Sequence, residues 1–166
     1  RQAIDTHVLL PRERERAYSL IRSQLELGRQ AFIVYPLVEE SENSDTPAAV
    51  QEYHRLKLEI FPKHQVGLLH GRMKPEEKDE IMSRFRDQQL HILVSTSVVE
   101  VGVDIPNASV MLIEGANRFG LAQLHQFRGR VGRGSDKAYC LLIPETPDAA
   151  ENERLQAMVE TNDGFV

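Results

Sequence analysis

The stretch RGRVGRG, from Arg128 to Gly134, places three guanidinium groups within six residues and interleaves them with glycines. Guanidinium stays charged and binds phosphate through a planar pair of donors, so this density predicts contact with an anion. Arg130 and Arg133 are three residues apart and would share one face of a helical turn. Such a pair can act as arginine fingers, which stabilise charge on a phosphoryl group held by a neighbouring domain. The same spacing also fits a surface turn of solvated arginines.

The sequence lacks the other parts of a phosphoryl-transfer site. None of its ten glycines fits the phosphate-loop pattern G-x-x-x-x-G-K-[ST]. The acid pairs at 39–40, 76–77 and 79–80 fall in a polar loop or a charged helical pattern. The histidines and the single cysteine show no metal-ligand spacing, so we expect no metal site. An intact transferase or phosphatase would need a complete site, and the sequence contains none.

The charge distribution favours a local anion contact over a broad one. A net charge of −5 argues against a general polyanion-binding surface. Residues 115–137, however, hold five basic and one acidic side chain (5 − 1 = +4). No apolar run approaches the length of a membrane span, and Cys140 lies in the apolar run AYCLLI. We expect a buried thiol in a reducing compartment.

Short apolar runs alternate with amphipathic segments along the chain. The expected strands are THVLL, AFIVYPL, QVGLLHG, HILVST, SVMLIE and AYCLLIP. The expected helices include one ending at Gly28, one ending at Phe61, one starting at Pro75, GLAQLHQFR, and 146–160 with Thr146 as its cap. The alternation predicts one open α/β domain with a mostly parallel sheet and helices on both faces.

In such a domain the working residues gather beyond the carboxyl ends of the strands. His70, Gly71 and Arg72 follow one expected strand, and Thr96 ends the next. The loop at 115–120 follows a third. We therefore expect these polar segments to lie at one edge of the sheet.

Two long stretches resemble a known enzyme family. SVVEVGVDIPNA and FGLAQLHQFRGRVGRG resemble motifs V and VI of the superfamily-two helicases, in the branch that remodels stalled replication forks. AFIVYPLVEES resembles the motif IV region, and LLHGRMKPEEKDEIMSRF resembles the segment after it. The resemblance covers nearly the whole chain. It implies that residues 1–166 form a second RecA-like motor domain, with the first motor domain, the wedge domain and most of a C-terminal coupling motif outside them.

The resemblance also implies the partners. ATP and Mg²⁺ would be held mainly by the first RecA-like domain of the same chain, and forked or branched DNA would be the substrate. The protein would belong to the bacterial cytoplasm, associated with the nucleoid. The isolated chain would be inactive as an ATPase. The corresponding motor of a transcription-repair coupling translocase and a non-enzymatic nucleic-acid-binding module remain as alternatives.

Motif VI has the form Q-x-x-G-R-x-x-R, and motif V contains a glycine and an aspartate near the nucleotide. By this match Arg130 and Arg133 would face the ATP γ-phosphate. The resemblance implies that the other nucleotide-site residues are Gln126, Gly129, Gly102 and Asp104. Arg128 is outside the common pattern, and we interpret it as a structural residue that pairs with an acid.

The resemblance assigns a second group of residues to DNA. Thr96 matches a position that touches the DNA backbone through its hydroxyl, and His70, Gly71 and Arg72 lie where relatives contact nucleic acid. For His70, capping the end of a strand is an equally good explanation. Glu100 stands where many relatives have arginine, so no role is carried over to it.

Overall fold

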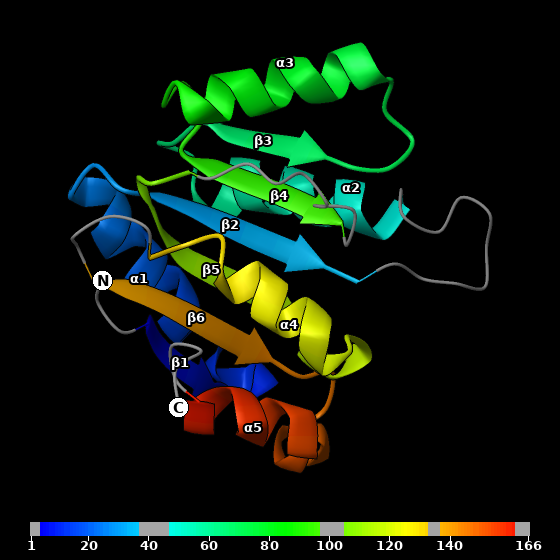
Figure 1. Cartoon of the computed structure of the whole chain (residues 1–166). Coiled ribbons are helices and arrows are strands. Elements are labelled where there is room, and N and C mark those ends of the chain that lie inside the picture. Colours follow the sequence, from blue (N-terminus) through cyan, green and yellow to red (C-terminus); the bar gives the residue numbers. More distant parts are fainter. Residues whose placement is uncertain (1–3, 37–46, 97–104, 133–136, 162–166) are drawn as a thin grey trace.

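Six parallel strands form one open sheet in the part of the chain that the structure describes. The computed structural model describes residues 4–36, 47–96, 105–132 and 137–161. The strands are Ile4–Val8 (β1), Gln30–Tyr35 (β2), Val66–Leu69 (β3), Ile92–Thr96 (β4), Ala108–Glu114 (β5) and Ala138–Ile143 (β6). Their order is β1-β6-β5-β2-β4-β3 (Figure 1), and every neighbouring pair is parallel. All strands thus begin at one edge of the sheet, the amino edge, and end at the other, the carboxyl edge.

Helices cover both faces of the sheet. They are α1 (Arg14–Glu26), α2 (Pro47–Arg55) with a following π turn (Leu56–Ile60), α3 (Pro75–Arg86), α4 (Leu121–Arg128) and α5 (Glu153–Thr161). Short 3₁₀ turns occupy Pro11–Glu13, Ala116–Arg118 and Pro147–Glu151. Buried side chains of α1 and the π turn pack on one face of the sheet, and those of α3, α4 and α5 pack on the other. The predicted fold, an open α/β sheet with helices on both faces, is confirmed.

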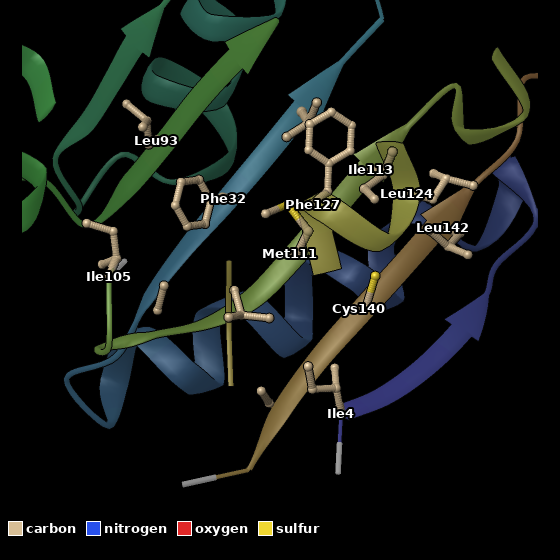
Figure 2. Close-up of a cluster of buried hydrophobic side chains, with 14 of the residues drawn as sticks. Ile4, Phe32, Leu93, Ile105, Met111, Ile113, Leu124, Phe127, Cys140 and Leu142 are labelled. Carbon is tan, nitrogen blue, oxygen red and sulfur yellow. The ribbon is translucent and has the colours of Figure 1, made fainter. Parts of the chain in front are cut away.

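The two-sided cover explains the continuous apolar runs in the sequence. Successive side chains of β2 alternate between the two cores, with Phe32 in one and Ile33 in the other. A strand buried on both faces has no solvent side on which to place polar residues. Figure 2 shows Leu124 and Phe127 of α4 packed over the sheet beside Leu142 and Met111.

The helix expected at 146–160 is wrong, because the chain breaks within it. Thr146 makes no capping hydrogen bond through its side chain, and the first turn is a 3₁₀ helix. Asn152 then adopts an extended ψ of 135°, and α5 begins at the next residue. The Oδ1 atom of Asn152 accepts a hydrogen bond from the backbone N–H of Arg154 at 2.7 Å. Asparagine favours this local bond over continuing a helix, and so caps α5 in place of Thr146.

Candidate functional site

Two of the expected polar segments lie side by side at the carboxyl edge. Leu69 of β3 pairs with Ser95 of β4, so His70 and Thr96 follow at the same level on neighbouring strands. Thr96 also pairs with Tyr35, the last residue of β2. The prediction that residues after successive strands gather at one edge is confirmed for these positions.

His70 closes the turn that follows β3. Its Nδ1 atom accepts a hydrogen bond from the backbone N–H of Arg72 at 3.2 Å, and its own backbone N–H contacts the Met73 sulfur at 3.4 Å. With Nδ1 as acceptor, the ring proton lies on Nε2, which can donate to a further group. His70 is half-buried, whereas Gly71 and Arg72 are exposed. The capping explanation for His70 therefore has direct structural support, and a contact through Nε2 is compatible with it.

Thr96 presents a buried hydroxyl with an unused capacity for hydrogen bonding. Its side chain is 0% exposed, and Oγ1 has no hydrogen-bond partner in the described ranges. The neighbouring hydroxyl of Ser95 is in the same situation. A buried polar atom without a partner costs about 1–3 kcal/mol, so native proteins seldom keep one without a reason.

The turn that carries Arg130 lies at the opposite edge. Helix α4 starts near the carboxyl end of β5 and runs back against the strand direction (Figure 1). A Cβ atom on Gly132 would lie 3.0 Å from Ile4 Cδ1 and 3.5 Å from Ala138 Cβ. Ile4 and Ala138 are the first residues of β1 and β6. The chain from Gly129 to Gly132 therefore lies at the amino edge, away from His70 and Thr96.

Arg130 has no partner within the described part of the chain. The residue is half-buried, and its Nε atom is shielded from solvent without a hydrogen bond. No ion pair or hydrogen bond of its side chain is formed with any described residue. A partly desolvated guanidinium with open donors is a poor structural element, because it loses water contacts and gains nothing in return.

Arg128, two residues earlier, has the opposite environment. It is 2% exposed, and Nη1 donates to Thr6 Oγ1 at 3.0 Å and to the Met158 carbonyl at 2.7 Å. Nη2 donates to Thr161 Oγ1 at 3.0 Å and lies 3.1 Å from His125 Nδ1. The structural interpretation of Arg128 is supported. The partners that the structure describes are hydroxyls, a carbonyl and an imidazole, where the sequence led us to expect a carboxylate.

One of the interleaved glycines, Gly132, serves the domain's own packing. Gly132 is buried with a φ of 80°, a backbone conformation that side chains with a Cβ rarely adopt, and it packs against Ile4. Glycines beside phosphate-binding arginines could instead allow a close approach to a partner's nucleotide. Gly132 does not serve that purpose, because the space beside it is filled by Ile4 of β1.

The remaining nucleotide-site residues are only partly described. Gln126 is exposed on α4, and Gly129 is the C-cap that directly follows that helix. Gly102, Asp104 and Arg133, together with Glu100, lie outside the described residues. After that motif V segment, the described chain resumes at Ile105, which is buried in the same cluster as Val131 and precedes β5. Ile105 thus places the end of motif V at the amino edge, on the same side as Arg130.

A polar cavity at the carboxyl edge was not expected from the sequence. It has a volume of 390 Å³ and is lined by ends of β2, β5 and β6 together with α1 and α2. Arg14 Nε and Nη2 each donate to one oxygen of Glu114 at 2.8 Å. Burial raises the pKa of Tyr35, which lines the same cavity. The two members of the ion pair are separated by 100 residues, so no local pattern signals it.

Within the described ranges, no cluster of histidine, cysteine or carboxylate side chains could hold a metal ion. Among the described helices, none has the length and apolar character needed to cross a membrane.

Comparison with known proteins identifies relatives for almost the whole chain. Residues 14–135 match the model of the helicase conserved C-terminal domain. The chain is 52% identical over 165 residues to the ATP-dependent DNA helicase RecG of Synechocystis, covering 99% of this chain and 20% of that protein. It is 44% identical over 165 residues to RecG of Bacillus subtilis, and the match covers 99% of this chain and 24% of that protein. The chain therefore spans between a fifth and a quarter of the length of these relatives.

Solved structures give the same relationship in three dimensions. A structure of RecG bound to a three-way DNA junction superposes with a TM-score of 0.82 at 44% identity, covering 99% of this chain and 21% of that one. Saccharomyces cerevisiae Dbp5 bound to RNA and ADP BeF3 superposes with a TM-score of 0.66 at 18% identity. The superposition covers 99% of this chain and 40% of the Dbp5 chain. At that identity the second likeness concerns the fold alone.

Proposed function

Because the chain belongs to the family of helicase conserved C-terminal domains, we propose that it is the second motor domain of an ATP-dependent DNA helicase of the RecG type. The longer protein would unwind and remodel branched DNA, such as stalled forks and Holliday junctions. The RecG structure bound to a three-way junction supports this choice of substrate, since it superposes over 99% of the chain.

The amino edge would face the nucleotide. The observation that carries this assignment is Arg130, whose Nε is buried and has no partner in the described ranges. An arginine that stabilises negative charge developing in the transition state needs N–H donors that are not already hydrogen-bonded within its own domain. Arg133 would act with Arg130. We propose that the residues completing this side of the cleft are Gln126, Gly129, Gly102 and Asp104.

ATP and Mg²⁺ would be held mainly by a first RecA-like domain, and this chain fits a supporting role. The sequence contains no phosphate loop, and the described residues hold no acid cluster for a metal. When bound between the domains, ATP would supply the phosphoryl group whose transfer drives movement. Arg130 and Arg133 would stabilise the negative charge that spreads over that group during transfer.

The carboxyl edge would contact DNA. Thr96 Oγ1 could accept or donate one further hydrogen bond, and His70 Nε2 can donate to a phosphate oxygen. Gly71 and Arg72 are exposed beside them. Nucleotide and DNA contacts would thus lie at opposite edges, separated by the length of a strand, about 20 Å for a seven-residue strand such as β5.

The test is turnover of the longer protein carrying Arg130→Ala or Arg133→Ala. Because the fingers act mainly in the transition state, kcat for DNA-stimulated ATP hydrolysis should fall by on the order of 10³-fold. ATP affinity should change much less. Arg118→Ala is the matched control, since Arg118 is exposed and pairs with Glu145 at 3.2 Å. Near-normal ATPase activity in the Arg130→Ala, Arg133→Ala double variant would refute the finger assignment.

A further inference from the structure

Strand β3 is the last strand at one side of the sheet (Figure 1), and its free edge lines a cavity of 440 Å³. We propose that this edge is a docking site for an extended acidic peptide of another protein, which would add a strand beside β3. The proposal concerns a protein partner, so it goes beyond the nucleotide and DNA contacts proposed above and does not depend on them.

The backbone of β3 has hydrogen-bonding groups that point away from the sheet. The Gln65 carbonyl, just before β3, accepts the N–H of Ile92 at 3.2 Å and therefore faces β4. Residues of a parallel strand face a given neighbour alternately, so Val66 and Leu68 face outward. No described strand or loop pairs with their backbone on that side. Their two N–H and two C=O groups could form four hydrogen bonds with an added strand, which is the usual mode of β-strand addition.

Two helices leave room for a peptide along this edge. Tyr53 and Lys57 line the cavity from α2 and its π turn, and Ile81 and Arg84 line it from α3. Side chains of an added strand would point alternately toward these two helices. Tyr53, Leu68 and Ile81 are half-buried, so they offer apolar surface to the inserted side chains. The site therefore suits a peptide in which apolar residues alternate with other residues.

The charges around the cavity favour an acidic peptide. Lys57, Arg72 and Arg84 line it, against one acidic side chain among the described residues, Glu77, although the chain has a net charge of −5. Glu77 Oε1 already accepts the backbone N–H of Lys74 at 2.9 Å, at the start of α3. The Arg84 side chain forms no ion pair or hydrogen bond with a described residue. Carboxylates of a peptide would complement this positive lining.

The same positive charge would also attract a DNA strand, but the edge backbone favours a peptide. Phosphate oxygens can only accept hydrogen bonds, so they would leave the outward carbonyls of Val66 and Leu68 without a partner. A peptide backbone supplies both N–H donors and C=O acceptors, at the spacing of the strand that it joins. We therefore commit to a peptide, and DNA becomes an outcome of the test.

The experiment measures binding of a short fluorescein-labelled peptide of alternating aspartate and valine to the longer protein by fluorescence anisotropy. Four hydrogen bonds and a few charge contacts correspond to weak binding, with a Kd of roughly 10 µM to 1 mM. One control peptide has lysine in place of aspartate. A second has methyl groups on alternate backbone nitrogens and so lacks donors for the carbonyls of β3. Both should bind about tenfold more weakly or worse.

Variants of the protein test the charge and the edge separately. Arg84→Glu should weaken binding roughly 3- to 10-fold. Arg86→Glu is the matched control, because Arg86 is exposed on the same helix and does not line the cavity, and binding should stay within about twofold. Leu68→Pro removes an outward N–H while the hydrogen bonds between β3 and β4 remain, and it should weaken binding about tenfold. The thermal midpoint shows whether each variant is folded. If Leu68→Pro does not fold, Arg84→Glu and the methylated peptide still decide the question.

Hydrogen exchange shows where the peptide binds. The amides of Val66 and Leu68 should exchange more slowly with the peptide bound, while the amides of β1, at the other side of the sheet, should not change. Unprotected Val66 and Leu68 amides, equal binding of the methylated peptide, or equal losses in Arg84→Glu and Arg86→Glu would each overturn the proposal. If a short oligothymidylate displaces the peptide and protects the same amides, the edge belongs to DNA and the peptide site is rejected. ATP hydrolysis by Arg130→Ala is independent of all these results, so either proposal can fail without the other.

Discussion

Replacing Gly132 by alanine tests the packing of the arginine turn against β1. Gly132 has a φ of 80°, and left-handed backbone costs a residue with a Cβ about 1–2 kcal/mol. The new Cβ would also lie 3.0 Å from both Cδ1 and Cγ1 of Ile4, which is 1% exposed and has little room to move. Overpacking of this kind typically costs about 1–3 kcal/mol. Together these effects predict a loss of about 2–5 kcal/mol and a fall in Tm on the order of 10 °C.

Two other glycines separate the two contributions. Gly28 has a φ of 84° with nothing within 4 Å of a new Cβ, so Gly28→Ala should show the backbone cost alone, about 1–2 kcal/mol. Gly120 has a φ of −74° and open space, so Gly120→Ala should show neither backbone strain nor overpacking; because Gly120 is the N-cap of α4, where alanine is disfavoured, it should cost roughly 0.5–1 kcal/mol. Thermal and urea unfolding of the 166-residue chain, followed by circular dichroism, measures all three. A Gly132→Ala variant no less stable than Gly28→Ala would refute the packing of the turn against Ile4.

The chain alone should show no ATPase activity and only weak nucleotide binding, because it has no phosphate loop; robust DNA-stimulated hydrolysis by the 166 residues would contradict the assignment as half of a motor. Burial raises the pKa of Cys140 to about 12, so a thiol reagent at pH 8 should react only after unfolding, and rapid labelling of the folded chain would count against the buried thiol. Burial, with a contribution from the Arg128 charge, lowers the pKa of His125 below its ordinary value of 6.5. The unfolded ring then binds a proton more readily than the folded one, so this contribution to stability is complete above pH 6.5 and is lost as the pH falls below it. The urea midpoint should therefore decrease from pH 7 to about pH 5.5, and His125→Gln should make that decrease smaller. His64→Gln is a second test, because burial also lowers the pKa of His64.

Much of the fold follows from local patterns in the sequence. Apolar runs with no polar alternation predict strands buried on both faces, and their alternation with amphipathic segments predicts a parallel sheet. Pro75 followed by two glutamates marks the start of α3, where the structure also begins it. Placing His70 and Thr96 at one edge needs only the rule that parallel strands end together.

The arginine turn depends on contacts that no local pattern contains. Arg128 and Arg130 have the same chemistry and differ by two positions, so spacing alone does not predict which one is buried. The tertiary structure decides it, because Thr6, which is 122 residues from Arg128 along the chain, comes within 3.0 Å of its guanidinium. The same holds for Gly132, whose neighbour Ile4 is brought to it by the pairing of β1 with β6. The sequence by itself determined the type and order of the strands and of most helices, since side-chain period acts over a few residues, but it did not reveal the break at Asn152. Only the tertiary structure determined that Arg128 is buried and hydrogen-bonded while the Nε donor of Arg130 has no described partner. That difference depends on groups brought together from distant parts of the chain.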